Sequence, residues 1–214
     1  MVWCRINKLI FIHIPKTGGE TIENILELTN HHNGYICIEK RALQHYTGID
    51  YYCFLGEEIY NEYFKFAVVR NPITRCVSEY YFSGCPIGYH QDKSFDEFLE
   101  SLEHIIKNNK YYETLYHDHF NSQTSYIYNE KKIIIDKIFR FEEYDKIIEF
   151  IYEKKWQEDK SKRNTHAQKA NLEKSKENEH LIIHQEKIIP NEEQKKKIYE
   201  LYEEDFINFN YNLT

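Results

Sequence analysis

The hydrophobic and polar positions of this chain alternate between short apolar runs and amphipathic stretches. Residues 9–14 and 64–69 are nearly continuous apolar runs rich in β-branched and aromatic side chains, as in strands buried on both faces. Apolar positions at helical spacing follow each run, over residues 21–28 and from Pro72 to about Phe82. This pattern predicts two parallel strands, each followed by a helix.

The rest of the chain continues the same alternation. Helical spacing predicts helices over residues 95–107, 142–156 and 191–209, and β-rich composition predicts strands over residues 35–38 and 132–139. Strands that alternate with helices indicate an α/β fold with a mainly parallel central sheet flanked by helices. In such folds ligands bind at the carboxyl ends of the strands.

The length of the chain and one polar segment bear on its domain organisation. The 214 residues fit one domain, which we expect to span residues 1–214. Residues 157–180 are polar, charged and poor in large apolar side chains. We therefore predict a mobile loop or lid over residues 157–190.

Charge and cysteine content exclude several classes of protein. A formal net charge of −7 argues against a nucleic-acid partner, which would favour clustered basic residues. The five cysteines are odd in number and form no CxxC pair, so neither a disulfide scaffold nor a zinc ribbon is expected. No signal peptide and no apolar run of about 20 residues, as a membrane span needs, is visible. We expect a soluble, cytoplasmic protein.

The first candidate site is the segment PKTGG, which follows the first strand. Gly18 and Gly19 let the backbone approach a ligand closely, and unpaired amides at the start of the next helix attract anions. Lys16 adds a positive charge, and Thr17 and Thr21 add hydroxyl donors. The lysine precedes the glycines, so the GxxxxGK[ST] pattern of nucleotide hydrolases is not met. By itself the segment fits a tight structural turn as well as an anion site.

The second candidate site is VVRNPITRCVSEYYF, over residues 68–82. Arg70 ends a strand, where a guanidinium can hold a phosphate through two parallel hydrogen bonds. Asn71 and Pro72 suit the cap and first position of a helix, in which Ser78 offers a hydroxyl two turns later. An ion pair for Arg70 and an ordinary helical role for Ser78 are the alternatives.

Together the two segments resemble the sulfotransferases that use 3′-phosphoadenosine 5′-phosphosulfate (PAPS). PKTGG followed by VRNPxxRxxSxYY is most similar to the branch of the heparan and chondroitin/dermatan sulfate 2-O-sulfotransferases and their bacterial and viral relatives. The resemblance implies a P-loop-like three-layer fold. It also implies that the 5′-phosphosulfate is held by Lys16, Thr17, Gly18, Gly19 and Thr21, and the 3′-phosphate by Arg70 and Ser78.

Four further segments, at residues 42–48, 120–127, 138–147 and 198–211, also resemble this family. The implied reaction is in-line transfer of a sulfonate group from PAPS to a hydroxyl, as of a carbohydrate, leaving 3′,5′-bisphosphoadenosine (PAP). Lys16 would neutralise the leaving oxygen, and His45 in the first of these segments would be the catalytic base. The chemistry requires no metal, and neither a nucleic-acid nor a membrane partner is implied.

Two departures from the family pattern keep other functions open. Glu20 stands where the family has threonine or serine, and Tyr46 replaces a small residue after the histidine. A carboxylate beside a dianionic ligand repels it unless the side chain points away. A protein that binds PAP or PAPS without transferring sulfonate is therefore one alternative. An atypical nucleotide or small-molecule kinase is the other, although the missing hydrolase pattern disfavours it.

Other polar residues were considered for metal or nucleotide binding. The pairs His31–His32 and His117–His119 could chelate a metal, but neither has a cysteine or carboxylate cluster at ligand spacing. The family resemblance implies that residues 117–123 border the acceptor cleft, so a contact with the acceptor is the preferred interpretation for the second pair. Arg140 follows a predicted strand, where it either pairs with a nearby carboxylate or approaches the nucleotide.

Overall fold

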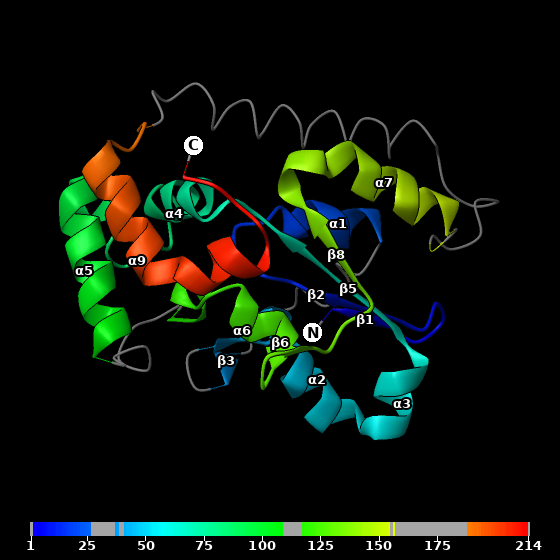
Figure 1. Cartoon of the computed structure of the whole chain (residues 1–214). Helices are drawn as coiled ribbons and strands as arrows, with labels where there is room; N and C mark the ends of the chain where they lie inside the picture. Colours follow the sequence, from blue (N-terminus) through cyan, green and yellow to red (C-terminus); the bar gives the residue numbers. More distant parts are fainter. Residues whose placement is uncertain are drawn as a thin grey trace.

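The centre of the computed structural model is a four-stranded sheet (Figure 1). The structure describes residues 2–26, 37–38, 41–108, 117–154, 156 and 188–213. The strand order is β1-β2-β5-β8. β2 (Leu9–Ile12), β5 (Phe64–Val69) and β8 (Lys137–Arg140) run parallel, and the edge strand β1 (Trp3–Cys4) is antiparallel to β2. The prediction of an α/β fold with a mainly parallel sheet is confirmed.

The helices form three groups around this sheet (Figure 1). One face is covered by α1 (Gly19–Ile25) and α7 (Tyr144–Glu153). On the other face lie α2 (Gly48–Leu55), α3 (Glu57–Glu62) and α6 (Thr124–Ile127). The third group, beside the sheet, consists of α4 (Pro72–Tyr80), α5 (Phe95–Lys107) and α9 (Glu192–Asn208). Two short ribbons complete the description: β3 (Cys37–Ile38) with β4 (Arg41–Ala42), and β6 (Tyr128–Asn129) with β7 (Lys132–Ile133).

Both faces of the central strands are buried, which explains their unbroken apolar runs. In β2, Leu9 and Phe11 point into the core beneath α1 and α7, whereas Ile10 and Ile12 point into the opposite core. All four side chains are fully buried. Because alternate residues of a strand face opposite sides, a strand covered on both sides needs an apolar residue at every position.

The β-rich run predicted within residues 132–139 is divided between two separate strands. β7 pairs antiparallel with β6, and β8 begins only at Lys137. Between them, the Asp136 carboxylate accepts a hydrogen bond from the Lys65 amide at 2.7 Å, and the Asp136 amide donates to the Lys65 carbonyl at 2.9 Å. These bonds direct the chain into the central sheet. Within one continuous β-rich run, the pairing therefore changes from β6 with β7 to β5 with β8.

The boundaries of the helices show which local sequence signals were sufficient to predict a helix. α4 begins at Pro72 and α5 spans residues 95–107 as predicted, although α4 ends at Tyr80 rather than near Phe82. α2 and α3 were not predicted, since their aromatic side chains leave little helical amphipathicity. The missed signal is the capping box of Thr47 and Asp50 at the start of α2.

Two predictions fall wholly or partly outside the described residues. The predicted strand over residues 35–38 coincides with β3 only at residues 37–38, and the predicted loop over residues 157–190 is described only at residues 188–190. Within the part of the chain that the structure describes, no helix combines the length and apolarity needed to cross a membrane. Cys4, Cys53, Cys76 and Cys85 are free thiols.

Candidate functional site

The two candidate segments meet at one edge of the sheet. β2 and β5 are adjacent and parallel, with Ile12 opposite Ala67, so the chain leaves both strands at the same edge. There the Arg70 guanidinium donates a hydrogen bond from Nη1 to the Lys16 carbonyl oxygen at 3.2 Å. Its Nε donates to Thr74 Oγ1 at 3.0 Å. The predicted neighbourhood of Lys16 and Arg70 is thus present as a direct contact.

The turn after β2 has an unusual backbone conformation that is held from several sides. Lys16 and Gly18 have φ angles of 68° and 79°, in the left-handed region that favours glycine. The buried Thr17 hydroxyl donates to the Ile14 carbonyl at 2.8 Å, and the Tyr144 hydroxyl donates to the Gly18 carbonyl at 2.9 Å. The Thr17 hydroxyl proton therefore stabilises the turn itself.

Gly19 is required by packing within the protein. A Cβ atom on Gly19 would lie 2.1 Å from Cδ2 and 2.2 Å from Nε2 of the His13 ring. His13 is buried and its Nδ1 contacts the Glu23 carboxylate, so the ring cannot withdraw easily. The second glycine of PKTGG is therefore needed because the His13 ring occupies the space that a Cβ atom would take.

Replacement of Gly19 by alanine is expected to lower the free energy of unfolding by about 3 kcal/mol, because an extra methyl group in a filled site forces its neighbours apart. Urea denaturation followed by circular dichroism measures the change. Gly56→Ala is the matched control, since Gly56 also resists alanine through its φ of 80° but has no atom within 4 Å of the added Cβ. Its expected loss is about 1 kcal/mol. Equal losses would contradict the close packing of His13 against Gly19.

Lys16 is held beside an aromatic ring and between acidic groups. It is half-buried, and its Nζ lies 4.3 Å from the centre of the Phe82 ring. Burial lowers the pKa of Lys16, while the carboxylates of Glu79 and Glu20 oppose that change. Glu20 itself is exposed in the first turn of α1. The ammonium group therefore lacks full hydration and depends on its neighbours for its charge.

Arg70 is fixed by a residue from a distant part of the chain. The amide group of the fully buried Gln123 accepts a hydrogen bond from the Arg70 backbone N–H and donates one to the Arg70 carbonyl, both at 2.8 Å. The Arg70 guanidinium lies over the Phe141 ring, 4.3 Å from its centre. Of the other predicted ligands, Thr21 is half-buried in α1 and Ser78 is half-buried in α4.

His45 is buried and paired with a carboxylate. It ends the 3₁₀ turn Leu43–His45, and its Nδ1 lies 2.6 Å from Oδ2 of the fully buried Asp118. Burial lowers the pKa of His45 to about 3, although the hydrogen bond to Asp118 raises it. An ionised carboxylate only accepts hydrogen bonds, so the proton is on Nδ1 and the lone pair is on Nε2. That Nε2 lies 3.2 Å from Nε2 of the Gln44 amide.

Two further histidine–carboxylate pairs flank His45. Nδ1 of His119 lies 2.9 Å from Oε2 of Glu79, and His13 contacts Glu23. The centres of the His13 and His119 rings lie 5.0 Å and 4.9 Å from that of His45, each in an edge-to-face arrangement. All six side chains of the three pairs are buried: His13, Glu23, His45, Asp118, His119 and Glu79.

Most of these residues were missed at the level of sequence. His13 and the segment HDHF at residues 117–120 were available signals, since a histidine within an apolar run must find a buried partner. Their carboxylate partners, however, lie at positions that no local pattern relates to them.

Three of these side chains could hold a metal ion. The donor atoms of His45, Asp118 and His119 all lie within 4.8 Å of one another, and all three residues are buried. The hydrogen bond between His45 and Asp118 accounts for their closeness without an ion. Of the two histidine pairs that could chelate a metal, His31–His32 and the side chain of His117 lie outside the described residues.

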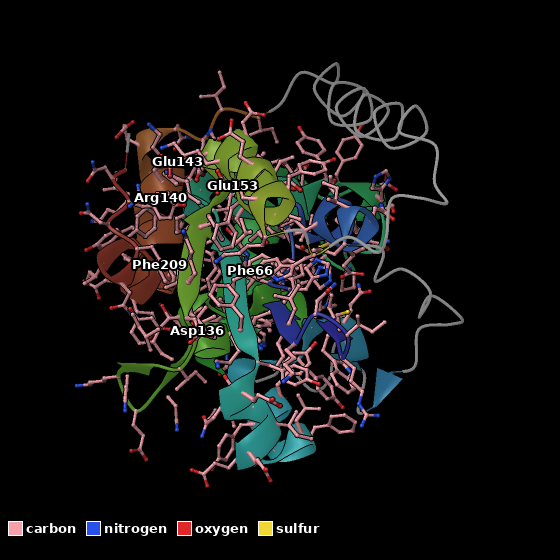
Figure 2. The ribbon with its side chains drawn as sticks, turned by 90° about the vertical axis from the view of Figure 1, so that its right-hand side faces the viewer. Phe66, Asp136, Arg140, Glu143, Glu153 and Phe209 are labelled. Carbon is pink, nitrogen blue, oxygen red and sulfur yellow. The ribbon has the colours of Figure 1, made fainter. Side chains whose placement is uncertain are left out.

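Arg140 and Tyr46 have structural contacts. Arg140 donates from Nη2 to the carbonyl oxygens of Phe209 and Asn210, and Figure 2 shows it at the end of β8 beside the end of α9. These bonds go to backbone carbonyls and not to a carboxylate, and the nearby Glu142 accepts from the Asn71 backbone N–H at 2.8 Å. Tyr46 packs edge-to-face against a buried tyrosine of α2, with ring centres 6.1 Å apart.

Comparison with known proteins gave a match to a protein family. A family model described as "Sulfotransferase family" matches residues 1–212, which is nearly the whole chain. Neither the curated proteins nor the solved structures contain a significant match.

Proposed function

Because the chain belongs to the sulfotransferase family, whose members are PAPS-dependent transferases, we propose that it sulfates a hydroxyl group of a carbohydrate. The observation that carries this proposal is the hydrogen bond between Arg70 and the Lys16 carbonyl, which joins the two nucleotide-binding segments. We further propose that the protein is closest to the 2-O-sulfotransferase branch. Residues 1–214 would form one catalytic domain, with residues 157–190 as its lid.

In this proposal the two segments share the donor between them. Lys16, the amides of the glycine turn and Thr21 bind the 5′-phosphosulfate, and Arg70 and Ser78 bind the 3′-phosphate. Thr17 contributes its backbone amide, because its hydroxyl donates to Ile14. The contact between Gln123 and the Arg70 backbone supports this role, since it fixes the strand end from which the guanidinium extends.

PAPS supplies a sulfonate group whose bond to the bridging phosphate oxygen breaks as the acceptor oxygen attacks sulfur in line. Negative charge then develops on the bridging oxygen, and Lys16 is proposed to neutralise it. The partial burial of Lys16 supports this role, because an incompletely hydrated ammonium group interacts more strongly with a developing anion.

His45 is proposed to remove the proton of the acceptor hydroxyl. The pairing of its Nδ1 with Asp118 supports this role, since it leaves the basic lone pair on Nε2. The acceptor hydroxyl would take the place of the Gln44 amide beside that atom. Asp118 then acts as a positioning residue, which holds the tautomer and stabilises the imidazolium ion after proton transfer.

Thermal stability in the presence of nucleotides tests the donor site. PAP is expected to raise the melting temperature strongly, whereas AMP and ATP are expected to have little effect, because only PAP carries both phosphates of the donor. Arg70→Ala is expected to lose most of the stabilisation by PAP, through loss of the bidentate grip on the 3′-phosphate. The melting temperature without ligand controls for damage to the fold.

The outcomes of this experiment separate the remaining alternatives. Equal stabilisation by ATP would overturn the assignment and favour a kinase. Stabilisation by PAP without transfer of labelled sulfate from PAPS to any member of a glycan panel would indicate a binding protein that lacks transferase activity. Transfer to a tyrosine peptide rather than to a glycan would replace the proposed acceptor class while leaving the donor site intact.

A further inference from the structure

The pair of Glu79 and His119 lies between the two residues proposed to carry out the reaction. Both side chains are buried, and their hydrogen bond of 2.9 Å is made inside the protein. A buried carboxylate is costly unless hydrogen bonds or opposite charges compensate it, so this pair is a built feature of the site. Glu79 occupies a place in the second candidate segment to which the sequence pattern assigns no role.

On one side the pair reaches Lys16. The His119 ring stacks on the Phe82 ring with centres 5.0 Å apart, and Lys16 Nζ lies 4.3 Å from the centre of that same Phe82 ring. Glu79 is also the carboxylate that most strongly favours the charged form of Lys16, ahead of the exposed Glu20. The lysine is therefore linked to this pair indirectly through the Phe82 ring, and the charge of Glu79 acts on it.

On the other side the pair reaches His45. The His119 ring meets the His45 ring edge to face, with centres 4.9 Å apart. Asp118, which holds Nδ1 of His45, directly precedes His119 in the 3₁₀ turn of residues 117–120. One short turn therefore positions both the partner of His45 and a ring that packs against His45.

A buried arginine fixes this turn to the loop that contains Lys16. Arg75 donates from Nε to the Pro15 carbonyl at 3.0 Å and from Nη2 to the His119 carbonyl at 2.9 Å. Pro15 directly precedes Lys16, so the two backbone segments are linked through one guanidinium. The loop that contains Lys16 and the turn that contains His119 are therefore held together at Arg75.

From these contacts we infer that Glu79 and His119 form a positioning pair, which holds the Lys16 ammonium group in place through the Phe82 ring and holds the His45 ring through its contact with His119. This inference rests on the proposed function. The pair touches neither the donor nor the acceptor in this proposal. Instead, the negative charge of the Glu79 carboxylate favours the charged form of Lys16, and the His119 ring packs against the His45 ring and holds it in place.

Glu79→Gln distinguishes this role from a simple charge effect, because the two predict opposite changes in PAP affinity. If Glu79 acted only through space, removal of a negative charge near the site would strengthen the binding of an anion. The positioning role predicts roughly tenfold weaker PAP binding by calorimetry, because Lys16 loses its main counter-charge. It also predicts a kcat roughly tenfold or more lower, with the KM for the acceptor unchanged.

The pH dependence of PAP binding supplies a second readout. Among the described residues, the charged or titratable groups that act on Lys16 include Glu79, Glu20, Arg70 and Cys85. Without Glu79, burial is opposed mainly by Glu20, so Lys16 loses its proton at a lower pH. The loss of PAP affinity in Glu79→Gln is therefore expected to grow from about pH 6.5 to about pH 9.

Glu20→Gln is the matched control, since it removes the same charge from a carboxylate that also acts on Lys16 but is exposed. Its PAP affinity is expected to equal or exceed that of the parent protein. If Glu79→Gln fails to fold, Glu79→Asp keeps the charge but withdraws it from His119, and is still expected to weaken PAP binding. Unchanged or tighter binding of PAP by the Glu79 variant that folds would overturn the inference. Failure of the parent protein to bind PAP would instead overturn the proposed function.

Discussion

Turnover of the His45→Asn variant is expected to fall about a thousandfold, which is the contribution of a well-placed general base. Asparagine is chosen because its amide nitrogen can take the place of Nδ1 and preserve the hydrogen bond to Asp118. The variant should therefore fold and bind PAP like the parent protein while lacking a base. Transfer of labelled sulfate from PAPS to the accepted glycan measures the change in kcat.

Asp118→Asn provides the comparison for this result. An asparagine amide that donates to Nδ1 would force the proton of His45 onto Nε2, so the basic lone pair would face away from the acceptor. A loss of about a hundredfold in kcat with unchanged PAP affinity is expected. If His45→Asn kept more than about a tenth of the parent turnover, His45 would not be the base.

The burial of His45 also determines the pH dependence of the rate. The base must be unprotonated, and burial lowers its pKa from 6.5 to about 3. Protonation of His45 in the free enzyme should therefore reduce kcat/KM only far below pH 6.5, where an exposed histidine would already have lost its basic form. An acid limb of kcat/KM near the ordinary pKa of histidine would contradict this assignment.

Removal of the charge of Lys16 is expected to have the second-largest effect. Lys16→Met keeps an unbranched side chain that can pack against Phe82, and its kcat is expected to fall by a factor of about 100 to 1,000 because no group neutralises the leaving oxygen. PAP binding should weaken as well, since the same ammonium contacts the 5′-phosphate end. Single-turnover transfer and calorimetry with PAP separate these two effects.

The pH profile again gives a check on the cause. Burial lowers the pKa of Lys16 from its ordinary value of 10.5, so the charge is lost as pH rises through that lower pKa. The alkaline limb of kcat/KM should lie below 10.5 in the parent protein and should be absent in Lys16→Met. A limb that persisted in the variant would have to arise from another group.

Much of the fold could be predicted because its signals are local. The apolar runs of β2 and β5 and the Asn71–Pro72 start of α4 are each readable within about ten residues. The change of partner near Asp136 could not be read, because it depends on a backbone pairing with Lys65, 71 residues away. The aromatic helix α2 was missed because it lacks a clear apolar face, and its only clear local signal was its capping box.

The candidate site divides in a similar way. The closeness of Lys16 and Arg70 could be predicted because each follows a central strand, and parallel strands place their ends at one edge. The partners that orient the site were not found, since Asp118 lies 73 residues from His45 and Gln123 lies 53 residues from Arg70. A side chain in a short polar turn has no pattern that reveals which distant group it will meet.

The sequence alone therefore determined the α/β fold class, the central strands β2 and β5, the two segments that meet at the sheet edge and the family resemblance. The tertiary structure decided that Gly19 makes room for His13 and that Arg140 donates to the Phe209 carbonyl. It also decided that the His45 ring meets two other histidine rings and that each of the three histidines has its own carboxylate. The physical reason is the range of the interactions. Backbone propensity and hydrophobic periodicity act between near neighbours in the chain, whereas buried charges are stabilised by whichever groups the fold brings within hydrogen-bonding distance.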